Sequence, residues 1–118
     1  MSETFETIQQ WGKDTFGDNI TLEGQIEKWH DEYAEFVDTT DENRLSEAAD
    51  LVIVSMNIAR FNLKVGFDYL AQTCHLLYET EYDGLALWEA VEQKMQTNRQ
   101  RKWSIGKGNF QHITENKE

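Results

Sequence analysis

The sequence predicts a single all-α domain, a bundle of four to five helices. The chain of 118 residues contains no proline, the residue that most often breaks a helix. Apolar residues make up 39% of the chain, and they recur three and four positions apart, as on the buried side of an amphipathic helix. Short polar or glycine-containing stretches separate these periodic segments. No linker or repeat divides residues 1–118, so we expect one domain.

The first two helices are predicted over residues 3–13 and from about 21 to 37. In the first, Phe5, Ile8 and Trp11 are three apart, and "FGDNI" ends the helix. In the second, the apolar residues are spaced four, three, four, three and one apart, which is typical of a bundle helix. These residues are Leu22, Ile26, Trp29, Tyr33, Phe36 and Val37.

The third helix is predicted over about 44–62, and it is apolar on nearly every side, so we place it at the centre of the bundle. Its "VIV" run is β-branched, but the length and the lack of alternation favour a helix. Two further helices are predicted over about 67–78 and 85–101, with Cys74 as a buried, inert thiol. The tail, residues 103–118, has no period and is predicted to be irregular.

The charge balance restricts the partners of the protein. The 22 acidic and 11 basic residues give a net charge of -11, which repels a nucleic acid polymer. A small phosphorylated ligand is still compatible, because a divalent metal inverts the local charge. No apolar run is long enough to cross a membrane, and "MSETFETIQQ" does not resemble a signal peptide. We therefore expect a cytoplasmic protein that does not bind membranes.

Four carboxylates are candidates for a metal site. Glu32 and Glu35 are three apart beside the apolar stripe of the second helix, and Glu47 and Asp50 have the same spacing on the third. A short turn joins the two helices, so they should pack antiparallel and bring these side chains together. Carboxylate oxygens, water and substrate phosphates are the usual ligands of Mg²⁺. The spacing therefore predicts a Mg²⁺ site.

Two simpler interpretations compete with a metal site. Such spacings arise by chance in an acidic chain, and for Glu32 and Glu35 alone a solvent-facing position is favoured. Glu47 lies on a helix with little polar surface, so the same explanation is weaker there. A buried salt bridge to Lys28 or Arg44 stays open as a second alternative.

The last predicted helix changes from apolar to cationic along one face. Leu87 and Val91 begin a stripe that Lys94, Asn98 and Arg101 continue at spacings of four and three. Arginine and lysine are common partners of phosphate, so this face is predicted to line a phosphate-binding cavity. The alternative is a helix end whose cations complement the helix dipole, which explains the asparagine less well.

The segments "DEYAEF", "EAADLV" and "KMQTNRQRKW" together resemble the all-α nucleoside triphosphate pyrophosphohydrolases of the MazG type. The hallmark of that family is Glu-x-x-Glu, a variable gap, and Glu-x-x-Asp, which Glu32, Glu35, Glu47 and Asp50 match here. The start "QQWGKDTF" and the cationic end look like a subgroup of small MazG-like proteins of phages and bacteria, associated with dATP and dGTP. The stretch 67–83, before the last predicted helix, looks longer than is usual in this family. It is a departure from the family pattern in the segment expected to cover the site.

The resemblance implies hydrolysis of a nucleoside triphosphate to the monophosphate and pyrophosphate, with Mg²⁺ as cofactor and Mn²⁺ as a substitute. Lys94 and Arg101 would hold phosphate oxygens, and Asn98 would orient a phosphate or the sugar. Glu35, with Glu32 beside it, is a candidate for the carboxylate that takes the proton of the attacking water, although the sequence does not choose among the four acids. The resemblance also implies a homodimer or homotetramer.

Three more residues are candidates for substrate binding, each with an alternative role. Trp11 can stack on a base, although packing in the core is favoured. Trp103 can cover the site or seal a subunit contact, and the sequence favours neither. Lys28 can contact phosphate or balance the charge of Glu32.

Two other functions compete with the hydrolase. Glu27 and His30 match the Glu-x-x-His element of di-iron bundles, but neither of the other two histidines follows a glutamate at that spacing. The second competing function is not enzymatic: the protein would be an acidic helical module that binds another protein or mimics DNA. In that case the acidic residues would matter as a broad surface, and replacing Glu47 alone would change little.

Overall fold

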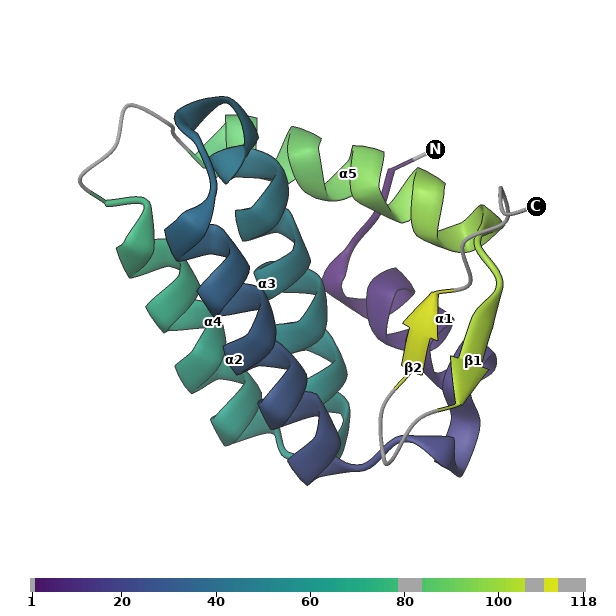
Figure 1. Ribbon diagram of the computed structural model, residues 1–118. Helices are drawn as coiled ribbons and strands as arrows, with labels where there is room; N and C mark the ends of the chain where they lie inside the picture. Colours follow the sequence, from purple (N-terminus) through teal and green to yellow (C-terminus); the bar gives the residue numbers. More distant parts are fainter. Residues whose placement is uncertain (1, 79–83, 106–109, 113–118) are drawn as a thin grey trace.

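The computed structural model describes residues 2–78, 84–105 and 110–112, and over these residues it is a helical bundle (Figure 1). This confirms the prediction of an all-α fold with four to five helices. The α-helices are α1 (Phe5–Phe16), α2 (Leu22–Asp38), α3 (Asp41–Phe61), α4 (Leu63–Leu76) and α5 (Gly84–Gln100). A 3-10 turn (Gly17–Asn19) follows α1, and the short strands β1 (Trp103–Ile105) and β2 (Phe110–His112) follow α5.

The central element is α3, as its apolar surface predicts. It packs against α1, α2, α4 and α5, and every residue from 51 to 59 is buried. Figure 1 shows α2 and α4 beside α3, with α5 crossing the bundle and α1 next to the hairpin. Although α3 is strongly apolar, no helix in the described part of the chain has the length and hydropathy that a membrane span requires.

Side-chain caps explain where the helices begin. The Thr21 hydroxyl accepts a hydrogen bond from the Gly24 N–H at 3.0 Å at the start of α2. Asn62 ends α3 and caps α4, because its Oδ1 accepts from the Val65 N–H at 3.1 Å. Such caps satisfy amide groups that the first helical turn leaves unpaired. The cap at Asn62 also makes α4 begin four residues earlier than the predicted 67.

The face that α4 buries is not the one that carries Cys74. Gly66 and Thr73 are buried, and Thr73 Oγ1 accepts a hydrogen bond from Trp29 Nε1 at 3.3 Å. Phe67 and Cys74 are exposed, so the prediction of a buried thiol is wrong. The spacing of apolar residues does not reveal which face of this helix is buried, because small residues such as Gly66 make the contact with α3.

The prediction of an irregular tail is wrong for residues 103–105 and 110–112, which form two strands, and the rest of the tail, residues 106–109 and 113–118, lies outside the described part of the chain. Trp103 pairs with His112 and Ile105 with Phe110 in an antiparallel hairpin. Strands of three residues are too short to produce a detectable alternation. The indole of Trp103 lies against the rings of Trp11 and Phe16, with centroids 5.9 and 5.3 Å apart. This contact places β1 against the end of α1 and beside the site described below.

Replacing Gly66 with alanine is expected to destabilise the bundle. A Cβ at Gly66 would lie 2.4 Å from the Cα of Ala59, so α3 and α4 would have to separate. We expect the free energy of unfolding to fall by about 1–3 kcal/mol, although alanine is the better helix former. Urea denaturation measures this change.

The matched control is Gly84→Ala, because a Cβ at Gly84 meets no described heavy atom within 4 Å. We expect its stability to be unchanged or slightly higher. Equal stability of the two variants would contradict close packing of α3 on α4.

Candidate functional site

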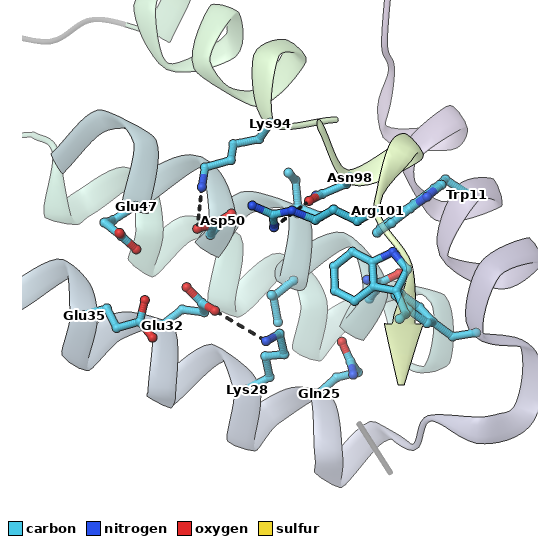
Figure 2. Close-up of a pocket in the computed structure, with 15 residues that line it drawn as sticks. Trp11, Gln25, Lys28, Glu32, Glu35, Glu47, Asp50, Lys94, Asn98 and Arg101 are labelled. Carbon is cyan, nitrogen blue, oxygen red and sulfur yellow. Dashed lines mark hydrogen bonds and ion pairs between the residues drawn. The ribbon is translucent and has the colours of Figure 1, made fainter. Parts of the chain in front are cut away.

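One cavity collects every residue that the sequence predicts for the site. It is lined by side chains from α1, α2, α3, α5 and β1, so no single helix builds it (Figure 2). The predicted residues that line it are Trp11, Lys28, Glu32, Glu35, Glu47, Asp50, Lys94, Asn98, Arg101 and Trp103. The acidic and cationic groups occupy one part of this cavity, and the aromatic rings lie toward α1 and β1.

The acidic part contains a compact group of three carboxylates. Glu32 from α2 and Glu47 and Asp50 from α3 each offer an oxygen that lies within 4.8 Å of the other two. All three side chains are half-buried. Glu35 lines the same cavity but is exposed and lies outside this group. The structure therefore groups three of the four predicted metal ligands, and the fourth, Glu35, lies at the edge of the group but close enough to add to the rise that burial and Asp50 cause in the pKa of Glu47.

Two oxygens of the carboxylate group have no hydrogen-bond partner in the described part of the chain. Glu32 Oε1 and Glu47 Oε1 are buried without a hydrogen-bond partner among the described residues. Burial, and then the neighbouring Asp50, raises the pKa of Glu32 to about 7 and also raises the pKa of Glu47. Buried carboxylates of this kind gain either a proton or a cation. The donor set, oxygen atoms only, suits a hard divalent ion such as Mg²⁺ or Mn²⁺.

Two lysines already pair with members of the group. Lys28 Nζ lies 3.4 Å from a Glu32 oxygen, and Lys94 Nζ lies 3.2 Å from an Asp50 oxygen, as the dashed lines in Figure 2 show. Burial raises the pKa of Asp50, and Lys94 opposes that rise. Lys28 therefore balances the charge of Glu32, as one of its two predicted roles states, and the partner of Asp50 is Lys94 rather than Lys28 or Arg44. The salt-bridge alternative does not account for Glu47, for which no ion pair is found among the described residues.

The end of α5 is packed rather than frayed. Val91 and Met95 are fully buried, and Asn98 is only 5% exposed. Asn98 Oδ1 accepts a hydrogen bond from Arg101 Nη1 at 3.4 Å, and both side chains line the cavity. The change from apolar to polar residues along α5 therefore marks the point where this helix passes from the core to the cavity.

The aromatic part of the cavity is a cluster of three rings. Trp11 lies edge-on to Phe16 with centroids 5.3 Å apart, and Trp103 contacts both rings. Trp11 is 7% exposed, so it packs in the core as favoured, although it also lines the cavity. Ile8 belongs to the same buried cluster as Trp11, whereas Phe5, on the same predicted stripe, is exposed and packs against Trp88.

Sequence reasoning missed two buried amides. Gln25 and Asn57 are 3% and 4% exposed, and both line the cavity. An asparagine in the middle of the apolar run "VIVSMNIAR" was a visible signal, because a buried amide needs hydrogen-bond partners. The contact between α1 and α3 that places Asn57 at the cavity is not visible in the sequence.

His30 and His75 lie outside the carboxylate group. His30 Nε2 lies 3.1 Å from the Tyr69 hydroxyl, and His75 stacks on Tyr78. Neither residue lines the cavity, so the structure offers no support for a di-iron site among the described residues. Comparison of the chain with family models, with curated proteins and with solved structures gives no match.

Proposed function

We propose that the protein hydrolyses nucleoside or deoxynucleoside triphosphates, with dATP and dGTP as first candidates, to the monophosphate and pyrophosphate. The observation that carries the proposal is the single cavity in which Glu32, Glu47 and Asp50 face lysine and arginine side chains beside an aromatic cluster. A triphosphate needs a cationic environment, and a base needs an apolar face. Membership of the MazG-like family is part of the same proposal, and it rests on the acidic and C-terminal motifs.

The three grouped carboxylates would hold Mg²⁺, with Mn²⁺ as a substitute. They fit such an ion because their oxygens converge and two of them are buried without a partner in the described structure. When bound, the ion supplies positive charge that neutralises the triphosphate and makes water more acidic. Glu35 lies at the edge of this group, and it would support the ion from there or act in proton transfer.

The remaining polar residues of the cavity have roles in phosphate binding and proton transfer. Lys28, Lys94 and Arg101 would bind phosphate oxygens and stabilise the charge that develops on the leaving pyrophosphate. Water would attack the α-phosphorus as the bond from it to the bridging oxygen breaks. Glu35 would accept the proton of that water, since it lies outside the grouped carboxylates. Asn98 would orient Arg101, to which it is hydrogen-bonded.

The acidic-module alternative receives less support. A protein-binding module or DNA mimic acts through exposed charge, whereas Glu32, Glu47 and Asp50 are half-buried and face a cavity. The net charge of -11 favours this alternative, but it does not explain why lysines line the same cavity. The first variant described in the Discussion separates the two functions.

Two properties accompany the proposal: a cytoplasmic location and a homodimer or homotetramer. One feature of the described surface supports association between copies of the chain: α4 exposes large apolar side chains. Leu63 is 60% exposed and Phe67 is 45% exposed. Apolar side chains that are exposed together are commonly covered by a partner, and a second copy of the chain would cover them here.

The reaction is tested with the eight common nucleoside and deoxynucleoside triphosphates in the presence of Mg²⁺. We expect equimolar monophosphate and pyrophosphate, fastest with dATP or dGTP, and no turnover when EDTA removes the metal. An analogue with a methylene group between the α and β phosphates should resist hydrolysis. The β,γ-methylene analogue should still be cleaved. Orthophosphate as the first product, or an inert protein, would contradict the proposal.

A further inference from the structure

Asn57 is a buried polar side chain that the proposed reaction does not use. It lies on α3 among aliphatic residues, it is 4% exposed, and it lines the cavity. Its Oδ1 has no hydrogen-bond partner among the residues that the structure describes. An unpaired buried amide costs free energy relative to an aliphatic side chain of similar shape. Packing alone therefore does not explain an asparagine at this position.

The neighbouring helix leaves room for this amide. A Cβ at Gly12 of α1 would lie 1.9 Å from Asn57 Oδ1, so only glycine fits against the amide as it stands. Arg60, three residues after Asn57, donates hydrogen bonds to the carbonyl oxygens of Gly12 and Gly17. These bonds hold the end of α1 against α3. The junction of the two helices is thus built around the amide.

The surroundings of Asn57 favour a flat ligand with a polar edge. Trp11, Phe16 and Trp103 line the same cavity and offer ring faces and edges, and the buried amide of Gln25 lies there too. Bases stack on aromatic side chains, and an asparagine amide pairs with a base edge through one acceptor and one donor. As it stands, Oδ1 faces Gly12, and the terminal torsion of asparagine is broad, so the amide would turn to present both its acceptor and its donor to a base.

We propose that this part of the cavity binds the nucleobase and that Asn57 determines which base is accepted. The inference rests on the proposed function, and it names the group that reads the substrate. Asn57 pairs with an edge that presents an N–H donor beside an acceptor atom. Gly12 is a positioning residue, since its missing side chain provides the space that the amide occupies.

The test measures binding, independently of hydrolysis. Calorimetric titration with dAMP, dGMP, dCMP and dTMP gives the base preference. Titration with tripolyphosphate, which has no base, measures binding to the lysine and arginine side chains of the cavity alone. Asn57→Asp replaces the donor with a second acceptor, which suits the adjacent N–H and amino donors of guanine. We expect the affinity for dGMP relative to dAMP to rise about tenfold or more. Tripolyphosphate affinity should stay within about twofold.

Asn57→Leu is the second variant, because a buried aspartate can reduce stability. It removes both polar atoms, so we expect the differences among the four monophosphates to disappear while tripolyphosphate binds as before. The control is Ser55→Ala, a buried polar residue of α3 whose hydroxyl donates to the Leu51 carbonyl at 2.8 Å and which does not line the cavity. It should leave the base preference unchanged.

The outcomes separate the inference from the reaction. A base preference that survives both Asn57 variants, or equal binding of all four monophosphates by the unmodified protein, overturns the inference and leaves the hydrolase proposal standing. A loss of tripolyphosphate binding equal to the loss of nucleotide binding also overturns it, because the effect is then not specific to the base. An inert protein that still shows the base-specific changes would refute the hydrolase and retain the base site.

Discussion

Replacement of Glu47 by glutamine is expected to lower Mg²⁺-dependent pyrophosphate release by about 10²–10³-fold. Glu47 belongs to the carboxylate group, and its Oε1 is buried without a partner in the described structure. Glutamine keeps the shape and removes the charge that would hold the metal. A coupled pyrophosphate assay measures the loss. Because burial raises the pKa of Glu47, the variant should melt at the same or a higher temperature in EDTA.

The matched control is Glu27→Gln, which makes the same change at an exposed position of α2 outside the cavity. We expect full activity and an unchanged melting temperature. Equal losses in the two variants would favour a broad acidic surface over a metal site. Full activity in Glu47→Gln would remove this residue from the proposed metal ligands.

Without divalent metal, the protein is expected to lose stability as the pH rises from about 5 to 8. The pKa of Glu32 is about 7 in the folded chain, against a reference value of 4.5. Between these values the folded state binds more protons than the unfolded state, so the free energy of unfolding falls as the pH rises. The stabilising contribution is complete below the lower value and is lost above the upper one. For Glu32 it is on the order of 3 kcal/mol.

The raised pKa values of Glu47 and Asp50 act in the same direction. Urea denaturation in EDTA at pH 5.5 and pH 8 measures the change, and Glu32→Gln is the control that removes the largest contribution. We expect the variant to lose less stability than the unmodified chain over this interval. Mg²⁺ should restore stability mainly at pH 8, where the carboxylates are ionised. Parallel pH profiles for the two proteins would rule out Glu32 as the titrating group.

Much of the fold follows from local periodicity. The stripe of α2 and the apolar surface of α3 predict two packed helices, because burial of one face imposes a period of 3.6. The predicted ends lie within one residue of the observed ones, except that α3 begins three residues earlier than predicted. The Glu-x-x-Glu and Glu-x-x-Asp spacings then place Glu32, Glu47 and Asp50 on facing surfaces, since an antiparallel pair joined by a short turn has few arrangements. These site residues could therefore be predicted without coordinates.

Other features depend on contacts between distant segments. The buried face of α4 follows from Gly66 lying against Ala59, and the hairpin lies beside α1 because Trp103 contacts Trp11. Glycine and a three-residue strand carry little periodic signal, so neither contact could be predicted from spacing. The exposed position of Cys74 is a consequence of the first contact.

The sequence by itself determined the helices, the central place of α3 and the residues of the acidic and cationic groups, because each depends on the spacing of side chains along one helix or two consecutive ones. Only the tertiary structure decided that Glu35 lies outside the compact carboxylate group, and that Asn57 and Gln25 share a cavity with the aromatic rings. The physical reason is that a cavity forms where separate elements meet. Its shape depends on how those elements pack, which no local pattern specifies.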